Sequence, residues 1–483
     1  MTLPLGFRGR LRPDVVRLDD GDALLGGSPL RMLRLSCRAR AALQGDVVTV
    51  TDAISAAVLD ALLEADLAEP EPEPADATVL DDLTVVVPVR DRPEQLERTL
   101  AALRSDGAPG RPQIVVVDDA SAAPEQNAMI AARHGARFLP LATNVGPAGA
   151  RNEGTRAAST RLVAFVDSDV QVGSAALLEL TAQLADPRVA MVAPRVVGRP
   201  ATSSPGPLAR FEAGRSALDL GPRSGLVQPG TLIPYVPSAC LVARREVVLD
   251  AFDVTRRVGE DVDLVWRLAD AGHRIRYQAE VVAEHEARGS LVAWACRVAV
   301  YGTSAAPLAR AHGAKVAPAR LHPSIAVTAL GLLSRRRWGL AVGIATGATA
   351  IHRVRRQLPP GESRLATRLT LQGIGWGVRQ ETTLMLRHWW PVTAVLAMRC
   401  PGARRVVGSA ILVQAALDWR EEPEHSLRPL SLVGRRVEDL AYGAGVWWGC
   451  WRARSLAALV PSLSRDRVDG RRPARLRSRS SRP

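Results

Sequence analysis

Two aspartates one residue apart follow a short apolar run near the middle of the chain. The run covers residues 162–166, and the carboxylates belong to Asp167 and Asp169. Five consecutive apolar residues that end at acidic residues are typical of a strand buried on both faces. Because side chains alternate along an extended backbone, Asp167 and Asp169 point to the same side. This pair suits a hard divalent cation that keeps some of its waters and is shared with a substrate phosphate. A surface turn is the alternative for an isolated Asp-Ser-Asp triplet.

The strand belongs to an alternation of strands and helices that begins near residue 83. Strand patterns lie at 83–89 and 114–117, helical patterns lie at 94–103 and 124–134, and a glycine-rich turn at 144–154 opens another helix. This alternation predicts an α/β fold with a mostly parallel sheet that helices cover on both faces. Charged residues follow three of the strands, and they are Arg90, Asp91, Asp118, Asp119, Asp167 and Asp169. Open sheets bind ligands at these carboxyl ends.

A small separate unit precedes the alternation. Two apolar stretches around a turn at 19–22 predict a hairpin, and helical spacing predicts helices at 30–43 and 54–67. Proline and glutamate then alternate from 69 to 76, which is typical of a stiff, solvated linker. We therefore expect one domain at 1–68 and a linker at 69–82 that decouples this domain mechanically from the rest of the chain.

Composition excludes several classes of protein and partner. The formal charge of +14 favours an anionic partner, but Lys315 is the one lysine among 63 basic residues, a skew typical of nucleotide-composition bias. No zinc-finger spacing or aromatic-interleaved basic stripe accompanies the charge, so we expect no nucleic-acid partner. The five cysteines are scattered, which excludes a disulfide framework and a zinc site and fits a reducing compartment. The first eight residues lack the apolar core of a signal peptide, so the catalytic part is predicted to be cytoplasmic.

An ordered set of motifs between residues 83 and 290 resembles the family 2 glycosyltransferases. The motifs are 87–91 (Val-Pro-Val-Arg-Asp), 117–121 (Val-Asp-Asp-Ala-Ser), 144–152 (Asn-Val-Gly, then Ala-Arg-Asn), 167–169 (Asp-Ser-Asp) and 259–268 (beginning Gly-Glu-Asp). The resemblance implies a GT-A-like catalytic domain at 83–290, of the nucleotide-diphospho-sugar transferase type, that uses a nucleotide-sugar donor. The mycofactocin-system members of the family are similar in having a small N-terminal domain and a long arginine-rich C-terminal region. The N-terminal unit resembles small winged-helix peptide-recognition modules of the PqqD type, and a plain accessory domain is the alternative.

The family's motifs imply roles for residues around the donor. Asp119 corresponds to the carboxylate that accepts a hydrogen bond from the uracil ring, and Arg151 to a contact with the donor's base or phosphates. Asp167 and Asp169 correspond to the ligands of Mn²⁺ or Mg²⁺, which neutralises charge on the departing diphosphate. His285 corresponds to a histidine that completes the metal or diphosphate site, and a solvated loop histidine is the alternative. The other implied donor-binding positions are Pro88, Arg90, Asp91, Asp118, Asn144 and Gly146.

On the acceptor side, the resemblance implies that Asp261, with Glu260 beside it, is the general base that removes the acceptor's proton. A carboxylate ordinarily titrates near pH 4, so Asp261 is expected to be ionised at neutral pH. The alternative for these two residues is a helix N-terminus stabilised by acidic side chains. The chain departs from the family pattern twice. Arg90 replaces an aromatic residue against the uracil, and 334–338 (Ser-Arg-Arg-Arg-Trp) lacks the glutamine of processive members, so the donor base and processivity stay open.

Residues 291–463 are predicted to be a helical region and 464–483 a basic disordered tail. Apolar stretches at 325–333 and 338–351 are shorter than the ~18 residues of a spanning helix. Arginine beside apolar and tryptophan-rich helices suits an anionic membrane surface, at the inner face of the cell membrane. A buried helical bundle that caps the acceptor site is the alternative.

Three functions compete. The first is an inverting transfer of glucose from UDP-glucose, in β linkage, to a mycofactocin-type peptide-derived redox cofactor or its precursor. The second is a membrane-associated transferase that builds cell-envelope polysaccharide or glycolipid, with a glycan as acceptor. The third is a nucleotide-binding protein without catalysis, against which the Asp-Ser-Asp and Glu-Asp pairs argue, because binding alone does not require a base.

Overall fold

The computed structural model describes residues 2–105, 110–200, 205–287, 290–422 and 424–463. These residues form two compact units. The first contains the N-terminal part of the chain and Glu212–Ala287, and the second contains Pro205–Phe211 and the chain from residue 290 onward. The predicted basic tail at 464–483 lies outside the described residues.

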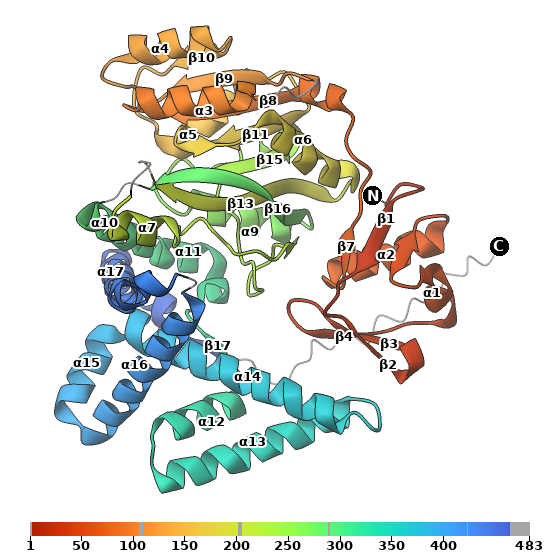
Figure 1. The fold of residues 1–483 in the computed structure, drawn as a ribbon, viewed down its shortest axis with the longest axis vertical. Coiled ribbons are helices and arrows are strands. Elements are labelled where there is room, and N and C mark those ends of the chain that lie inside the picture. Colours follow the sequence, from red (N-terminus) through yellow and green to blue (C-terminus); the bar gives the residue numbers. More distant parts are fainter. Residues whose placement is uncertain (1, 106–109, 201–204, 288–289, 423, 464–483) are drawn as a thin grey trace. The chain divides into compact units, whose positions relative to one another are not determined.

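A sheet of nine strands, counted over the described residues, forms the centre of the first unit (Figure 1). The strands are β8 (Leu83–Val89), β9 (Gln113–Asp118), β10 (Arg137–Pro140), β11 (Leu162–Val166), β12 (Val170–Gln171), β13 (Val189–Pro200), β14 (Gly225–Leu226), β15 (Cys240–Arg244) and β16 (Arg274–Ala287). Their order across the sheet is β10-β9-β8-β11-β15-β13-β16-β12, and β14 also pairs with β16. The strand predicted before Asp167 is therefore β11, near the middle of the sheet.

The sheet is parallel in one half and mixed in the other. Strands β8, β9, β10 and β11 pair in parallel, which confirms the prediction for this half. Strand β15 runs antiparallel to both β11 and β13, while β12 and β14 run antiparallel to β16. Neighbouring parallel strands need a crossover connection, usually a helix. The described part of the connection from β13 to β15 contains α7 (Pro207–Ala213), β14 and otherwise irregular backbone, and β15 enters the sheet in the direction opposite to both of its neighbours.

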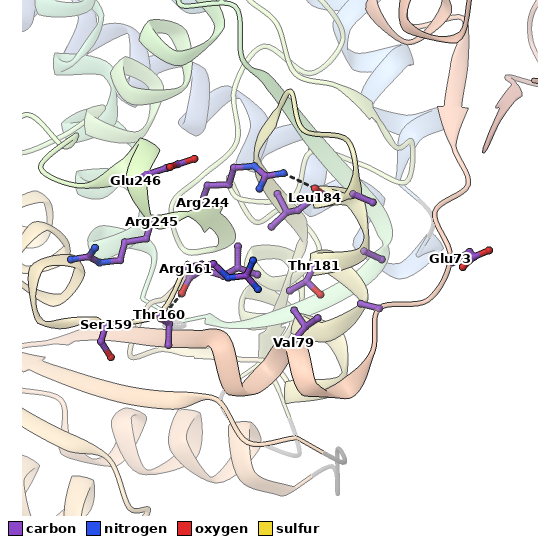
Figure 2. Close-up of a pocket in the computed structure, with 14 residues that line it drawn as sticks. Glu73, Val79, Ser159, Thr160, Arg161, Thr181, Leu184, Arg244, Arg245 and Glu246 are labelled. Atoms are coloured by element: carbon purple, nitrogen blue, oxygen red, sulfur yellow. Dashed lines mark hydrogen bonds between the residues drawn. The ribbon is translucent and has the colours of Figure 1, made fainter. Parts of the chain in front are cut away.

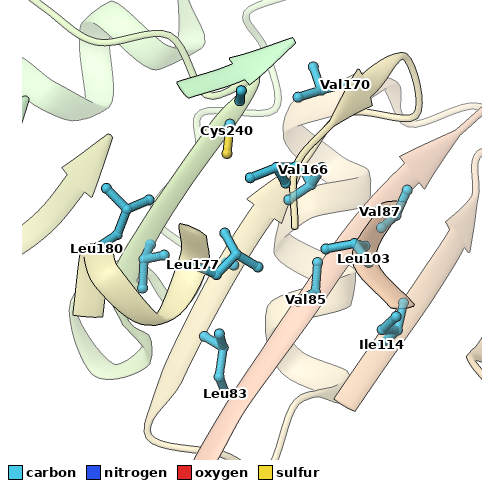
Figure 3. Close-up of a cluster of buried hydrophobic side chains, with 14 of the residues drawn as sticks. Leu83, Val85, Val87, Leu103, Ile114, Val166, Val170, Leu177, Leu180 and Cys240 are labelled. Carbon is cyan, nitrogen blue, oxygen red and sulfur yellow. The ribbon is translucent and has the colours of Figure 1, made fainter. Parts of the chain in front are cut away.

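Helices cover both faces of the sheet, which explains why its strands are continuously apolar. On one face the core side chains come from β8, α3 (Pro93–Ser105) and α6 (Ser174–Ala182), and they include Val85, Val87, Leu103, Leu177 and Leu180 (Figure 3). On the other face lies α5 (Gly146–Ala157). This helix approaches so closely that a Cβ on Gly154 would meet the Val86 side chain at 2.2 Å. The close approach fixes the start of α5 beside the carboxyl ends of β8 and β9.

The N-terminal part of the first unit contains two small sheets and two helices. Its elements are β1 (Arg8–Leu11), β2 (Val16–Leu18), β3 (Ala23–Gly26), β4 (Arg31–Arg34), α1 (Cys37–Ala42), β5 (Leu43–Gln44), β6 (Val47–Thr49), α2 (Ala53–Glu64) and β7 (Ala68–Pro70). The predicted hairpin is confirmed, because β2 and β3 pair antiparallel around the turn. The helix predicted at 30–43 is wrong in its first half. Residues 31–34 form β4 against β3, and α1 begins only after Ser36, whose side chain caps it. Four residues are too few to separate helical spacing from strand alternation.

The segment expected to be a solvated linker is ordered at both of its ends. Residues Ala68–Pro70 pair with β1, and Ala77–Asp82 form a 3₁₀ helix that leads into β8. Residues 68–70 are thus an edge strand of the small sheet, a position in which proline is tolerated.

Helices make up most of the second unit. They are most of α7 (Pro207–Ala213), α10 (Leu291–Thr303), α11 (Ala305–His312), α12 (Pro323–Leu333), α13 (Arg337–Gln357), α14 (Ser363–Thr383), α15 (Trp390–Arg399), α16 (Pro401–Glu421) and α17 (Arg428–Ala453). Helices α12 and α13 approach through glycine: a Cβ on Gly331 would lie 2.6 Å from the carbonyl oxygen of Gly339. Within the described part of the chain, none of these helices has the combination of length and hydropathy needed to cross a membrane.

Candidate functional site

The Asp-Ser-Asp motif forms a tight turn directly after β11. The Asp167 amide donates to Ala239 O at 2.9 Å, and the Val170 amide donates to Asp167 O at 2.9 Å. From α3, the Thr99 hydroxyl donates to Ser168 O at 2.9 Å. The turn's backbone is therefore held by its own hydrogen bond, by Ala239 just before β15 and by α3.

Each carboxylate of this turn pairs with an arginine. Arg92 Nη1 donates to Asp169 Oδ2 at 2.5 Å, and Arg151 Nη2 donates to Asp167 Oδ1 at 2.6 Å. Arg92 precedes α3 and was missed by the sequence reasoning, although it directly follows the predicted Arg90 and Asp91. Its proximity to Asp169 depends on the pairing of β8 with β11, which brings residues 77 positions apart together.

Arg151 connects the metal motif to the acceptor-side motif. Its guanidinium also donates to Glu260 Oε1 at 3.1 Å and lies 5.5 Å from the ring centroid of Phe252. Only 3% of Arg151 is exposed, so the side chain lies under the site between two carboxylates. An arginine is suited to this position because its planar fork can serve two acceptors at once.

His285 reaches the same turn from the far edge of the sheet. It lies on β16, opposite Val170 of β12, and its Nε2 is 3.8 Å from Asp169 Oδ2. Asp167, Asp169 and His285 offer oxygen and nitrogen ligands of the kinds that Mn²⁺ accepts. Among the residues whose positions are described, no three or more His, Cys, Asp or Glu side chains gather closely enough to hold a metal by themselves. The set therefore fits a cation that completes its coordination with water and a substrate phosphate.

The two aspartates after β9 are buried and bound to nearby backbone. Asp118 accepts from the Ser121 amide at 2.8 Å and from Asn127 Nδ2 at 2.7 Å, which fixes the turn before α4 (Pro124–Arg133). Asp119 accepts from the amides of Val145 and Gly146 at 2.7 and 2.9 Å. Asp119 thereby holds the glycine-rich turn against the end of β9.

The rim of this edge carries the remaining predicted donor-side residues. Asp91 Oδ1 accepts from the Ala122 amide at 2.7 Å and joins the loops after β8 and β9. Arg90 and Pro88 lie beside it, with the Arg90 side chain 54% exposed. Asn144 Oδ1 accepts from Arg257 Nη1 at 2.9 Å.

Arg257 is a second cation that the sequence reasoning missed. It lies against Gly146, which has φ +78°, and a Cβ there would be 2.7 Å from Arg257 Nη1. Glycine at this position therefore permits both the left-handed backbone and the approach of the guanidinium. The signal was present in the sequence, since Arg257 stands two residues before the Gly-Glu-Asp motif.

The acceptor-side motif begins helix α9 (Glu260–Asp270), whose N-cap Gly259 has φ 79°. Acidic residues in the first turn of a helix are stabilised by its positive end, as the alternative interpretation of Glu260 and Asp261 requires. Asp263 does serve the fold, because it is buried and pairs with Arg267 at 2.7 Å. Asp261 is different: it is partly exposed, and no arginine or lysine lies within ion-pair distance of it among the contacts described.

The expectation that Asp261 titrates like an ordinary carboxylate is wrong. Burial of the carboxyl group, with the negative charge of Glu260 second, raises the pKa of Asp261 to about 7. Hydrogen bonds from the Val262 and Ser238 backbone and the charge of Arg151 oppose this rise. The sequence could not predict the shift because desolvation depends on how the helix packs. A carboxylate with a pKa near neutrality is a stronger base than an ordinary one and suits proton removal.

One groove in the described part of the chain lies away from these residues. It has a volume of about 680 Å³ and is lined by residues at the amino end of β11 and the end of β15 (Figure 2). Its arginines are engaged by the fold: Arg244 donates to Val189 O at 2.9 Å and to Leu184 O at 2.6 Å. None of the predicted site residues lines it. Because the strands of the parallel half end at the opposite edge, we place the candidate active site at Asp167, Asp169 and Asp261.

Comparisons with known proteins identify a family model, related sequences and a similar solved structure. Residues 84–252 match the family model described as glycosyl transferase family 2. Over 480 residues the chain is 38% identical to the pre-mycofactocin glycosyltransferase of Mycobacterium tuberculosis, covering 95% of this chain and 98% of that protein. It is 34% identical over 197 residues to an uncharacterized glycosyltransferase of Mycobacterium bovis, covering 40% of this chain and 82% of that one. Among solved structures, it is similar to a mannosyltransferase of Pyrobaculum calidifontis in complex with GDP-Man and Mn²⁺, with a TM-score of 0.42, 20% identity, and coverage of 77% of this chain and 89% of that one.

Proposed function

The chain belongs to the family 2 glycosyltransferases, and we propose that it transfers glucose from UDP-glucose, in β linkage, to pre-mycofactocin or a related peptide-derived redox cofactor. The family makes the chain an enzyme, which sets aside the alternative of a nucleotide-binding protein without catalysis. The observation that carries the proposal is the pair of contacts made by the buried Arg151, one with Asp167 in the turn after β11 and one with Glu260, which directly precedes Asp261 at the start of α9. It joins a cation-binding turn to a carboxylate of near-neutral pKa, and a transferase needs both.

On the donor side, we assign the nucleotide to the loops after β8 and β9 and the glycine-rich turn before α5. Asp119 keeps a fixed orientation because two backbone amides hold it, and this suits a carboxylate that must receive one hydrogen bond from a base. Arg92 and Arg257 supply positive charge at the same edge for a diphosphate. Asp169, Asp167 and His285 would hold Mn²⁺ or Mg²⁺. When bound there, the cation would supply charge neutralisation to the departing diphosphate.

On the acceptor side, Asp261 would take the proton of the attacking hydroxyl. The acceptor oxygen forms a bond to the anomeric carbon while the bond from that carbon to the UDP oxygen breaks, and the proton passes to the Asp261 carboxylate. One carboxylate and one displacement give inversion, so an α-linked donor yields a β-linked product. Arg151 would hold Glu260 in place and limit the rise in the pKa of Asp261.

The second unit carries an observation that favours a membrane surface as a further partner. Trp338 at the start of α13 is 63% exposed and follows three consecutive arginines, and Trp451 of α17 is 69% exposed. Tryptophan beside arginine suits the interface of an anionic bilayer. We propose that the enzyme binds the inner face of the cell membrane through these helices. An envelope glycan or glycolipid is therefore the alternative acceptor.

The N-terminal residues 1–68 are proposed as a winged-helix-like peptide-recognition domain, and residues 83–290 and 291–463 as the catalytic and helical regions.

The test uses the full-length protein with UDP-glucose, UDP-galactose or GDP-mannose, each with Mn²⁺, in the presence and absence of pre-mycofactocin. We expect UDP release from UDP-glucose to be fastest and to accelerate with pre-mycofactocin, and NMR to show a β-glucoside. Acceleration only by envelope glycans or glycolipids would favour the alternative acceptor. Sedimentation with vesicles of phosphatidylglycerol, compared with phosphatidylcholine and with the variant Trp338→Ser, tests the membrane contact separately.

A further inference from the structure

A long segment between β13 and β15 lies against the proposed base. Residues 223–239 contact α9 where Trp266 Nε1 donates to Pro234 O at 2.7 Å. The backbone of Ser238 in the same segment also lowers the pKa of Asp261. Ser238 is 3% exposed, so this contact is inside the protein. The segment therefore packs against the helix that carries Asp261 and contributes to the electrostatic environment of its carboxyl group.

The N-terminal domain holds the same segment from the other side. Asp66 Oδ1, directly after α2, accepts from the Leu226 amide at 3.2 Å, and Arg12 Nη2 donates to Ser224 O at 2.8 Å. Ser28 Oγ accepts from the Leu232 amide at 2.9 Å. These bonds satisfy backbone groups of a segment that has little regular structure of its own.

The two charged residues in this contact are deeply buried. Asp66 is 4% exposed and Arg12 is 5% exposed, and they form an ion pair at 3.3 Å. A buried ion pair adds little net stability to a fold. It does require its two partners to stay in contact, because removal of one leaves an uncompensated buried charge. Their burial therefore points to a role in fixing the position of the segment.

A second group of ion pairs fastens the N-terminal domain to the start of β16. Arg274, 2% exposed, donates to Asp60 Oδ1 of α2 and to Asp186 Oδ2, each at 2.8 Å. Arg188 reaches Asp60 and Glu64 at 3.0 and 3.1 Å. The expectation that the linker decouples the N-terminal domain mechanically is therefore wrong. Sequence could not show this because the partners are more than 120 residues apart.

We propose that Asp66 and Arg12 are positioning residues for the transfer reaction, through which the N-terminal domain holds residues 223–239 against Asp261 and shapes the acceptor side of the site. The inference rests on the proposed role of Asp261 as base. It assigns the N-terminal domain a part in the chemistry as well as in acceptor recognition. The donor side, at the ends of β8, β9 and β11, has no contact with these two residues among those described.

The test compares Asp66→Asn and Arg12→Gln with the control Asp46→Asn, which breaks the exposed pair of Arg17 and Asp46 within the same domain. Asparagine tolerates the positive φ of 55° at position 66, so the first change alters charge with little backbone strain. Hydrogen–deuterium exchange of the full-length protein is measured on peptides covering 223–239. We expect faster exchange there in both variants and unchanged exchange in the control. Wild-type exchange in this segment, in variants whose α2 peptides remain protected, would overturn the proposal.

Steady-state kinetics test the proposal independently of hydrogen–deuterium exchange in residues 223–239. A misplaced catalytic group costs up to about 10²-fold in rate, so we expect kcat with pre-mycofactocin to fall roughly tenfold or more while the KM for UDP-glucose stays within twofold. Because the Ser238 backbone favours the ionised base, loss of this contact should also move the acid limb of the pH profile to higher pH. An unchanged kcat and pH profile would refute the positioning role.

Two further experiments distinguish failure of the positioning role from unfolding of the N-terminal domain and from failure of the proposed function. If Asp66→Asn unfolds the N-terminal domain, Ser28→Ala removes only the bond to the Leu232 amide and is expected to loosen residues 228–236 alone; no change in exchange there would overturn the proposal. If the wild-type enzyme transfers no glucose to pre-mycofactocin, the proposed function fails. The exchange data and the pH dependence of UDP-glucose hydrolysis then still decide the role of Asp66 and Arg12.

Discussion

Arg151 Nη2 lies 2.6 Å from Asp167 Oδ1, while Nη1 of the same guanidinium reaches Glu260 at 3.1 Å. This single buried side chain joins the donor-side turn to the acceptor-side helix. Two motifs that are almost a hundred residues apart in the chain are thereby fixed relative to each other. An enzyme that must align a departing diphosphate with an attacking hydroxyl needs such a connection.

Replacement of Arg151 by methionine should destabilise the fold, because Asp167 and Glu260 lose their common cation in a buried setting. Breaking one side of a buried ion pair typically costs about 3–5 kcal/mol of the free energy of unfolding. The matched control is Arg156→Met on the same helix, where the arginine is 49% exposed and pairs with Glu153 and Asp250. A surface pair of this kind contributes about 0–1 kcal/mol. Urea unfolding of both variants measures the difference, and equal losses would contradict the bridging role.

The parallel half of the fold, and the position of the acidic residues at one edge of its sheet, could be predicted from sequence. Strand ends in a parallel sheet meet at one edge, so acidic residues after β8, β9 and β11 had to converge. The resemblance to the family predicted that His285 lies near the metal or diphosphate site, and the pairing of β12 with β16 brings it close to Asp169. The positions of these residues follow from the order and direction of the strands, and the apolar pattern of each strand can be recognised in the local sequence.

The parts that sequence did not predict depend on tertiary packing. Arg92 and Arg257 lie at the candidate site because of their contacts with Asp169 and Asn144, which belong to other parts of the chain. The antiparallel direction of β15 follows from its pairing with β11 and β13, which the pattern of its own residues does not report. The raised pKa of Asp261 and the ionic attachment of the N-terminal domain both arise from burial, which no local pattern reports.

Chelation should abolish transfer, and added Mn²⁺ should restore it. Asp169→Ala is expected to retain the fold, since it removes a carboxylate after the strand end and no apolar core side chain, but to lose Mn²⁺ binding measured by electron paramagnetic resonance. Full activity in excess chelator would contradict the assignment of the turn.

The ion pair between Arg92 and Asp169 leads to a prediction about the affinity for Mn²⁺. A hydrogen bond to a charged group contributes about 1.5–3 kcal/mol, so a bound cation competes with Arg92 for this carboxylate. We therefore expect Arg92→Gln to bind Mn²⁺ roughly tenfold more tightly than the wild type when no donor is present. Arg98→Gln, on the same helix and paired with Glu286, serves as control and should bind Mn²⁺ like the wild type. Calorimetric titration separates the two, and weaker binding by Arg92→Gln would refute the competition.

Asp261→Asn should separate proton removal from donor binding. Asparagine keeps the shape and the hydrogen bonds but cannot accept the proton, and loss of a positioned general base typically costs about 10²–10⁴ in rate. Turnover with acceptor is expected to fall by that order, while the affinity for UDP-glucose stays within a few-fold. Asp119→Ala should do the reverse and weaken donor affinity more than turnover of the bound complex. Asp270→Asn, at the other end of α9, is the control. Near wild-type transfer by Asp261→Asn would assign the base to Glu260 or Asp263 instead.

The pH dependence of the reaction follows from the pKa of about 7 at Asp261. Below this value the carboxyl group is protonated and cannot act as a base, so kcat/KM for the acceptor should fall tenfold per pH unit on the acid side. The raised pKa also determines how the free energy of unfolding changes with pH. Between about pH 4 and pH 7 the folded protein retains this proton, whereas the unfolded chain, in which the pKa is near 4, releases it. Asp261 therefore contributes stability that declines as pH rises from about 4 to about 7.

Two variants test the electrostatic origin of this pKa. Glu260→Gln removes a negative neighbour, so the acid limb should move to lower pH, although the loss of its contact with Arg151 also reduces activity. Asp261→Asn should remove the contribution of this group to the decline in stability between pH 4 and 7, measured by urea unfolding at several pH values. Since burial is the larger cause of the raised pKa, the limb in Glu260→Gln should still lie above pH 4. A limb that stays near pH 7 in Glu260→Gln would mean that the negative charge of Glu260 does not set the titration of Asp261.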